Sequence, residues 1–196
     1  ERASPPTLVF EDVDGDGPVW IGLEGRLYKV GESSSGTLQA DPVLPGFEYG
    51  AETYLSDFLP AGPGLWISTE NGLYFINRRT GEWKRYAHDP GNPRSLTQNF
   101  ITGLARTSDG GTVAVSLHGM NLFNPVTDDF ERIGGEVINC IKVNGDQILL
   151  GTETSGLQTY IPKQLFVNNF RHDELDPRSL AAGAVNAVLQ EPDGRL

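Results

Sequence analysis

The stretch HDPGNPRSL at residues 88–96 occurs a second time as HDELDPRSL at residues 172–180. Six of the nine positions are identical, and the two copies start 84 residues apart. An acidic chain of ordinary complexity does not give such a match by chance. The chain is therefore built of repeats.

A second phrase recurs four times and sets the length of the repeat. It reads VWIGLEGRLYKV from Val19, LWISTENGLYFI from Leu65, VAVSLHGMNLF from Val113 and ILLGTETSGLQTYI from Ile148. When Trp20, Trp66, Ala114 and Leu149 are aligned, the steps between copies are 46, 48 and 35 residues, and the third repeat has Ala114 in place of the Trp. A period near 45 residues with strand-like content is typical of the blades of a β-propeller.

Each repeat divides into four short strands separated by turn residues. In the second repeat these are residues 54–59, 65–69, 72–77 and 83–86, and no ten-residue stretch of the chain has a helical period. We therefore predict an all-β fold, a β-propeller fragment of four four-stranded antiparallel blades plus the first strand of a fifth. The expected blades span about residues 7–49, 50–96, 97–134 and 135–180, and the further strand falls within 181–196.

The composition excludes several classes of function. The chain has 26 acidic residues against 15 Lys and Arg, a net charge of −11, and no run of basic residues. A nucleic-acid or anionic membrane surface is therefore not expected. No apolar run of about 18 residues predicts a membrane span, and the single Cys140, in an apolar strand, is expected to be a buried and inert thiol.

The two ends of the sequence suggest a piece of a longer protein. The chain starts at Glu1 without a Met, and residues 184–190 read as the first strand of another blade. The sequence EPDGRL then stops where the other copies continue with an apolar triplet. We expect further propeller blades and signalling domains outside this sequence.

The repeats resemble the two-component regulator propeller family. The resemblance rests on residues 88–96 and 172–180, the Asp-Gly pairs Asp109–Gly110 and Asp193–Gly194, and the stretch from Trp66 to Tyr74. It implies the extracytoplasmic, periplasmic sensor region of a bacterial membrane-bound regulator, often a hybrid histidine kinase anchored in the inner membrane. In that family, tandem propellers detect a ligand such as a glycan breakdown product.

The repeated residues themselves favour a structural role. Asp, Asn and Ser side chains bond to their own backbone in turns, and Pro fixes the loop. A residue that recurs in two blades is expected to hold each blade together, so we interpret His88 and His172 as structural. Trp20 and Trp66 are likewise expected to pack blade against blade.

The segment Asp12, Asp14, Asp16, Gly17 has the spacing of a calcium-binding loop. Pro18 follows directly, however, and Leu23 stands at the twelfth position instead of an acid. The segment also lies where other repeats have a hairpin turn, which is the reading we favour. No metal or other cofactor is expected.

Enzyme chemistry is poorly supported by the residues. Glycoside hydrolysis needs two facing carboxylates, but the expected inner strands at residues 101–105, 137–143 and 184–190 carry no Asp or Glu, and Asp57 stands alone on its strand. A lyase similar to the streptogramin lyases needs a His with an acid or base partner, and His118 is the only His outside the repeated phrase. We therefore expect no catalytic residue in this chain. The alternative is a propeller lyase or glycoside hydrolase whose catalytic residues lie in other blades.

The function that we predict is ligand sensing. Loops joining second to third strands gather on one face of a propeller, where variable residues converge without disturbing the blades. The expected ligand-binding residues are therefore those at the tips of these loops: Glu70, Asn71, His118, Glu153 and Thr154. Their donors and acceptors suit a small molecule or oligosaccharide. Apolar blade faces left open would also allow a homo-oligomer.

Overall fold

The computed structural model describes residues 8–11, 19–23, 25–32, 34–43, 47–50, 53–162, 166–181 and 184–189. These residues form sixteen β-strands and no helix. The strands make four antiparallel sheets of four, and each sheet is a meander in chain order. The all-β fold of four-stranded propeller blades is thus confirmed.

The strands fall at or close to the expected positions. The first blade consists of β1 (Leu8–Glu11), β2 (Val19–Leu23), β3 (Arg26–Glu32) and β4 (Leu38–Pro42). The second consists of β5 (Leu55–Ala61), β6 (Gly64–Thr69), β7 (Gly72–Asn77) and β8 (Trp83–Tyr86). The third consists of β9 (Ile101–Arg106), β10 (Thr112–Ser116), β11 (Gly119–Asn124) and β12 (Asp129–Ile133). The fourth consists of β13 (Ile138–Asn144), β14 (Gln147–Thr152), β15 (Leu157–Ile161) and β16 (Phe166–Phe170).

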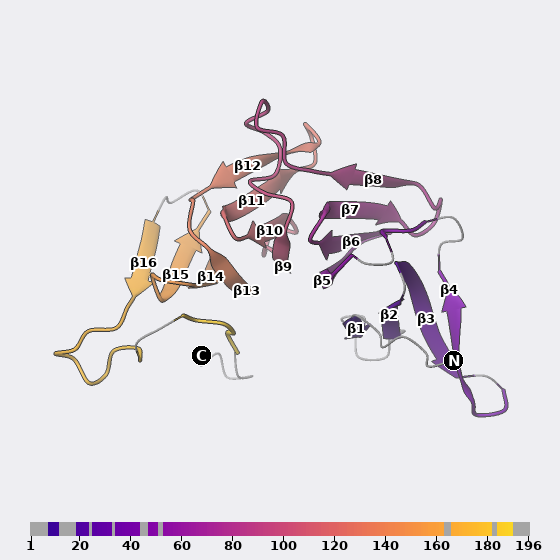
Figure 1. Cartoon of the computed structure of the whole chain (residues 1–196), viewed down its shortest axis with the longest axis horizontal. Coiled ribbons are helices and arrows are strands. Elements are labelled where there is room, and N and C mark those ends of the chain that lie inside the picture. The colour runs from indigo at the N-terminus through magenta and orange to yellow at the C-terminus, as the bar shows by residue number, and fades with distance from the viewer. Residues whose placement is uncertain are drawn as a thin grey trace.

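The four sheets are arranged as an arc (Figure 1). The first strands of the blades, β1, β5, β9 and β13, lie along its concave side, and the fourth strands lie on its convex side. Consecutive inner strands are in contact, β5 with β9 and β9 with β13. This radial order is that of a propeller, with the concave side of the arc facing the axis.

The opening strand of a fifth blade is not formed as a strand in the described residues 184–189. The segment nevertheless occupies an inner-strand position, because the Val185 N–H donates to the Thr152 carbonyl at 3.0 Å. It lies so close to β14 that a Cβ on Gly151 would be 2.8 Å from the Val185 carbonyl oxygen. An inner strand acquires its ladder from the second strand of its own blade, and no such strand pairs with residues 184–189 in the described part of the chain.

Hydrophobic cores lie between the blades, as expected for Trp20 and Trp66. Trp20 is 5% exposed and belongs to the core between the first and second blades. Trp66 is 2% exposed and packs toward the third blade, with its ring 4.8 Å from that of Phe123. Phe130 of β12 and Leu96 of the connecting loop complete this second core. The blades are therefore held face to face by large side chains from their second strands.

The alignment of Ala114 with Trp66 is wrong by one residue. Ser116 pairs with Gly119 as Thr69 pairs with Gly72, so β10 reaches its turn one residue earlier than expected. The residue in the place of Trp66 is therefore Val113. The packing agrees, because Val113 faces the fourth blade whereas Ala114 faces the second.

A repeated hydrogen bond joins the inner strands. The second residue of β5, β9 and β13 donates from its side chain to a backbone carbonyl of the next inner segment: Ser56 to Ile101, Thr102 to Ile138 at 2.8 Å, and Asn139 to Val185 at 3.4 Å. Backbone groups on the axial edge of an inner strand have no neighbouring strand in their own sheet. These side chains supply the missing partner and link blade to blade.

Thr102→Val removes this donor while keeping the shape of the side chain. We expect the free energy of unfolding to fall by about 1–2 kcal/mol, because the Ile138 carbonyl loses a partner in a half-buried site. Urea denaturation followed by tryptophan fluorescence measures the change. Thr80→Val, in an exposed turn, is the matched control and should change stability by less than about 0.5 kcal/mol. Equal effects of the two substitutions would contradict the assignment.

The repeated phrase forms the same folded loop in both copies. His88 Nδ1 donates to the Leu96 carbonyl at 2.7 Å, and His172 does the same to Leu180 at 2.8 Å. The Ser95 hydroxyl accepts from the Asp89 N–H and donates to the Asp89 carbonyl. Ser179 makes the equivalent pair of bonds with Asp173. The structural interpretation of the phrase is supported, since its polar side chains are used within the loop.

The two copies differ in how they are docked. The first sits on β12 of the following blade, where the Arg132 guanidinium donates to the Ser95 carbonyl at 2.8 Å and to the Asn92 carbonyl at 2.9 Å. Leu96 is fully buried beneath it. In the second copy Leu180 is 36% exposed and Leu175 is 93% exposed. One sequence motif therefore has two different environments.

This difference predicts unequal effects of the same substitution. Ser95→Ala should lower the free energy of unfolding by about 1–2 kcal/mol, because the Asp89 N–H and the half-buried Arg132 guanidinium each lose their hydrogen bond to the Ser95 hydroxyl. Ser179→Ala should cost less than about 0.5 kcal/mol, because water replaces the hydroxyl of an exposed loop. Chemical denaturation of the two variants side by side measures both losses of unfolding free energy. A larger loss for Ser179→Ala than for Ser95→Ala would contradict the prediction.

Candidate functional site

The turns that carry the expected site are built by one recurring hydroxyl. Thr69, Ser116 and Thr152 end the second strands, and each donates to the carbonyl of the Gly that begins or precedes the third strand, at 2.8, 3.2 and 2.8 Å. Each also accepts a backbone N–H from within its turn. Because this hydroxyl forms hydrogen bonds with the backbone of the turn, the side chains at the tip of the turn are left available for other contacts.

The turns β6–β7, β10–β11 and β14–β15 lie on the same face as the starts of the inner strands. The pairing shows this, since Leu55 faces Thr69, Ile101 faces Ser116 and Ile138 faces Thr152. The five expected residues, Glu70, Asn71, His118, Glu153 and Thr154, are all exposed. They form a rim of three neighbouring tips, and a ligand would have to span them to touch all three.

In the second blade, Glu70 and Asn71 form hydrogen bonds with the two residues that precede β5. Glu70 Oε1 accepts the Tyr54 N–H at 3.3 Å, and Asn71 Nδ2 donates to Thr53 Oγ1 at 3.4 Å. The Arg85 guanidinium donates to the Asn71 carbonyl. The second carboxylate oxygen of Glu70 takes no part in this bond and can accept from a ligand.

In the third blade, His118 Nδ1 lies 2.5 Å from Gln98 Oε1. Because the amide oxygen only accepts, the proton of this bond belongs to Nδ1, and Nε2 of the neutral ring is an acceptor. In the fourth blade, Glu153 Oε2 accepts from Asn139 Nδ2 at 3.0 Å. Each tip is thus fixed by its own blade, and these bonds do not connect one tip to another.

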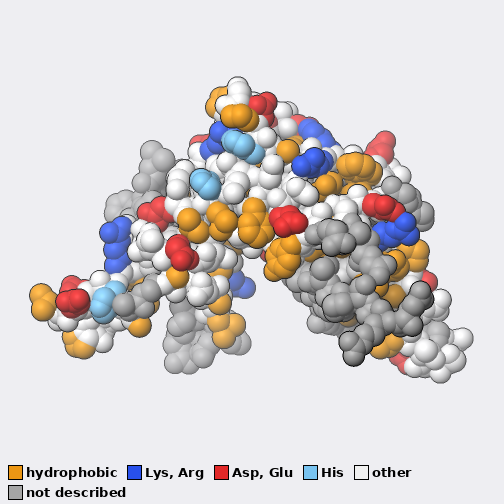
Figure 2. All heavy atoms as spheres, viewed as in Figure 1, with side chains coloured by type: hydrophobic (Ala, Val, Ile, Leu, Met, Phe, Trp, Pro, Cys, Tyr) orange, Lys and Arg blue, Asp and Glu red, His pale blue; other side chains and the backbone are white. Residues whose placement is uncertain are grey.

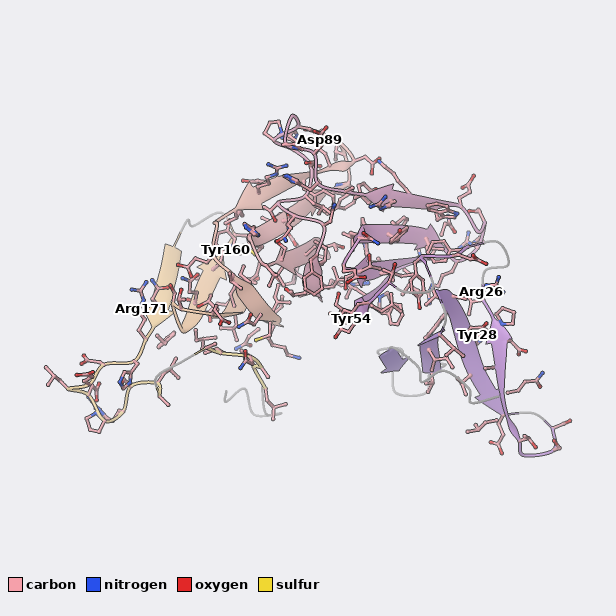
Figure 3. All side chains as sticks on the ribbon, in the orientation of Figure 1. Arg26, Tyr28, Tyr54, Asp89, Tyr160 and Arg171 are labelled. Carbon is pink, nitrogen blue, oxygen red and sulfur yellow. The ribbon has the colours of Figure 1, made fainter. Side chains whose placement is uncertain are left out.

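An aromatic pair that the sequence reasoning missed lies beside these tips. The rings of Tyr54 and Phe100 are 6.3 Å apart at 76°, an edge-to-face contact. Tyr54 is 53% exposed and lies at the concave edge of the arc (Figure 3). Both residues directly precede an inner strand. That recurrence, an aromatic followed by the first residue of an inner strand, was the signal available in the sequence.

The space-filling view shows the surroundings of this pair. On the face seen in Figure 2, hydrophobic and acidic side chains lie next to one another along the concave edge, with a His close by. Aromatic rings can stack on the apolar ring face of a ligand, and a flanking carboxylate and imidazole can accept hydrogen bonds from the hydroxyl groups of that ligand.

The alternative calcium loop of Asp12, Asp14 and Asp16 lies outside the described residues. Among the described residues, His, Cys, Asp and Glu side chains do not gather into a group of three that could hold a metal ion. In the same part of the chain, no helix is long and apolar enough to cross a membrane.

Asp57 is the one carboxylate on the described inner strands of the second, third and fourth blades. Its Oδ2 accepts the Leu104 N–H of the next blade at 2.9 Å, and its Oδ1 accepts the Phe58 N–H at 2.8 Å. Burial raises the pKa of the carboxyl, and the two backbone hydrogen bonds oppose that rise. Both oxygens therefore bind backbone, and Asp57 joins two blades.

The raised pKa makes a pH-dependent contribution to stability. The native state binds the Asp57 proton more tightly than the unfolded state, so the stability that comes from this group falls as the pH rises from the ordinary value of 3.8 through the higher native pKa. Asp57→Asn keeps an acceptor for Leu104 but cannot titrate. We expect the difference in unfolding free energy between variant and wild type to shift in favour of the variant across this window. Urea denaturation at several pH values measures it, and a constant difference would contradict the assignment.

Cys140 is partly buried, and burial raises the pKa of its thiol. A raised thiol pKa lowers the fraction of the reactive thiolate at neutral pH. This agrees with an inert residue.

Comparison with solved structures shows which proteins share this arrangement. The extracellular domain of a hybrid two-component system from B. thetaiotaomicron superposes with a TM-score of 0.66 at 18% identity, over 87% of this chain and 25% of that one. The extracellular domain of a second such system from the same organism gives a TM-score of 0.65 at 15% identity, over 98% and 30%. The chain thus spans about a quarter to a third of these structures.

Enzymes with the same fold are also similar. A virginiamycin B lyase from Staphylococcus aureus superposes with a TM-score of 0.62 at 12% identity, over 89% of this chain and 58% of that one. No protein-family model matches the sequence, and no curated protein matches it either. At these identities the likeness shows the fold, which is that of a β-propeller.

Proposed function

We propose that this chain is part of an extracytoplasmic ligand-sensing propeller of a bacterial two-component signalling protein. The observation that carries the proposal is the pair of exposed Tyr54 and half-buried Phe100 on the face that also bears Glu70 and His118. Such a surface suits an oligosaccharide or another small polyhydroxylated molecule. The rings stack on the apolar face of a sugar, and the carboxylate and imidazole accept from its hydroxyl groups. Asn71, Glu153 and Thr154 extend the surface over the neighbouring tips.

The similarity to extracellular domains of hybrid two-component systems supports the sensing role and the periplasmic location. In this reading the propeller passes a change of shape or association to signalling domains of the same inner-membrane protein. The net charge of −11 argues against a nucleic-acid partner.

Further blades of the same protein are the proposed partners of the fourth blade. Phe170 is 52% exposed and Leu180 is 36% exposed at its outer edge, whereas the equivalent Leu96 is fully buried against β12. An outer strand with an aromatic and an Arg, like Phe130 and Arg132, would cover the second loop as β12 covers the first. Association of two copies through this surface would cover it in another way.

A lyase or glycoside hydrolase is the second candidate, favoured by the fold shared with the virginiamycin B lyase. The geometry supports it less well. Asp57 has both oxygens bound to backbone N–H groups, and His118 faces an amide instead of an acid. Under this candidate the catalytic residues lie in other blades, and we propose that the present chain has none.

Binding of defined oligosaccharides tests the sensing proposal. A panel of cello-, xylo-, malto- and hyaluronan oligosaccharides is screened by thermal shift, and hits are measured by calorimetry on the chain and on the complete protein. Replacing Tyr54 and Phe100 by Ala should weaken binding at least about tenfold, since the stacking of a sugar on an aromatic ring contributes on the order of 1 kcal/mol or more per ring. Replacing Glu70, His118 and Glu153 together should do the same.

Val126→Ala is the matched control, because this apolar side chain is 90% exposed on an outer turn away from the tips. It should leave the affinity unchanged. If the aromatic and the polar replacements both leave the affinity of a confirmed ligand unchanged, the site lies elsewhere. If a hit is cleaved during the measurement, the enzyme candidate takes precedence.

A further inference from the structure

Two neighbouring blades enclose a wedge-shaped space between their facing sheets, which we call a wedge. The wedge between the third and fourth blades is built differently from the wedge between the second and third blades. The link from β8 to β9 comprises residues 87–100 and includes the folded loop that buries Leu96 between the blades. The link from β12 to β13 comprises only residues 134–137. The wedge between the third and fourth blades therefore has no loop that places a leucine in it. It also has Val113 in the place of the large Trp66.

A cavity of about 240 Å³ lies beside this short link, whose Gly134 and Glu136 line it. Its walls are mainly apolar and come from both blades, with Met120 on one side and Ile138, Leu150 and Tyr160 on the other. Packed protein interiors contain few voids larger than a water molecule. An apolar cavity of roughly 150 Å³ binds benzene, so this one has room for a body of that size.

One carboxylate faces this apolar space. Glu136 lines the cavity and stands two residues before Ile138, as Asn99 stands two residues before Ile101. Asn99 Oδ1 accepts the His88 N–H, so in the filled wedge this position binds the loop. The Glu136 oxygens accept from Ser155 Oγ at 2.8 Å and from Gln158 Nε2 at 3.1 Å.

Both of these donors are neutral. The ion pairs between described residues do not include Glu136. A half-buried carboxylate in apolar surroundings loses hydration that neutral donors only partly replace. A cationic donor replaces the lost hydration of the carboxylate more fully, because it forms a charge-assisted hydrogen bond. The net charge of −11 further favours a positively charged ligand over an anion.

We propose that this wedge is a binding site for a small amphipathic amine. The ammonium group bonds to Glu136, and an apolar body of about the size of a phenyl ring occupies the cavity beside this carboxylate. The ligand thereby lies beside the link of residues 134–137, where the preceding pair of blades has the longer link that carries Leu96. The site adjoins the polar rim of the proposed sensing surface, because Gly119 and Ser155 directly follow His118 and Thr154, but it takes a different class of ligand.

The probe is 2-phenylethylamine, compared with 2-phenylethanol, which has the same apolar body and no charge. Calorimetry or ligand-observed NMR on the 196-residue chain should show saturable binding of the amine at least about tenfold tighter than that of the alcohol. Glu136→Gln should abolish this preference and leave the affinity for the alcohol unchanged. Glu82→Gln, at an exposed turn of the second blade, is the matched control and should change neither affinity.

A second variant tests the cavity itself. Leu150→Phe adds volume to the wall and should weaken amine and alcohol alike, with thermal unfolding used to verify that the variant is folded. Equal affinity of the wild type for the two probes, no saturable binding of the amine, or an unchanged preference in Glu136→Gln would each overturn the proposal. Glu70→Ala, in the second blade, should not affect amine binding, so this variant distinguishes the amine site from the polar rim.

Discussion

The packing between adjacent blades is the interaction on which the rest of this structure depends. Each four-stranded sheet has two faces to cover, and no helix covers either of them in the described residues. The blades spread apart with distance from the axis, so the space between them widens outward (Figure 1). Where the sequence supplies Trp66 and a folded loop ending in Leu96, the wedge is filled. Where the link between two blades has only four residues, a cavity lies beside that link.

The axial side of the blades has a different problem, which is the unpaired backbone edge of each inner strand. Small polar side chains solve it by bonding to the next blade, as Thr102 does to Ile138 and Asp57 does to Leu104. This use occupies the polar groups closest to the axis. The groups left for a ligand are those one turn further out, at the tips after the second strands. Structure and recognition are thus separated by position along the same short strands.

The repeated loop shows how much of a motif is local and how much depends on its neighbours. Its internal bonds, such as His88 to Leu96 and His172 to Leu180, are the same in both copies. Its burial is not, because only the first copy is covered by the outer strand that carries Arg132. A sequence motif of this kind specifies a conformation, and a neighbouring blade specifies whether that conformation becomes part of a core.

The sequence by itself determined the fold class, the four blades and the positions of their strands, because alternation, turn residues and repetition are local properties of the chain. It also identified Trp20 and Trp66 as contacts between blades. It placed Ala114 wrongly, because the length of β10 is set by pairing with β11 and not by the phrase. Only the tertiary structure brought Tyr54 against Phe100 and left Glu136 facing a cavity, since both depend on side chains from different blades. Contacts between repeats are not encoded within one repeat, and the sites proposed for this protein are built from such contacts.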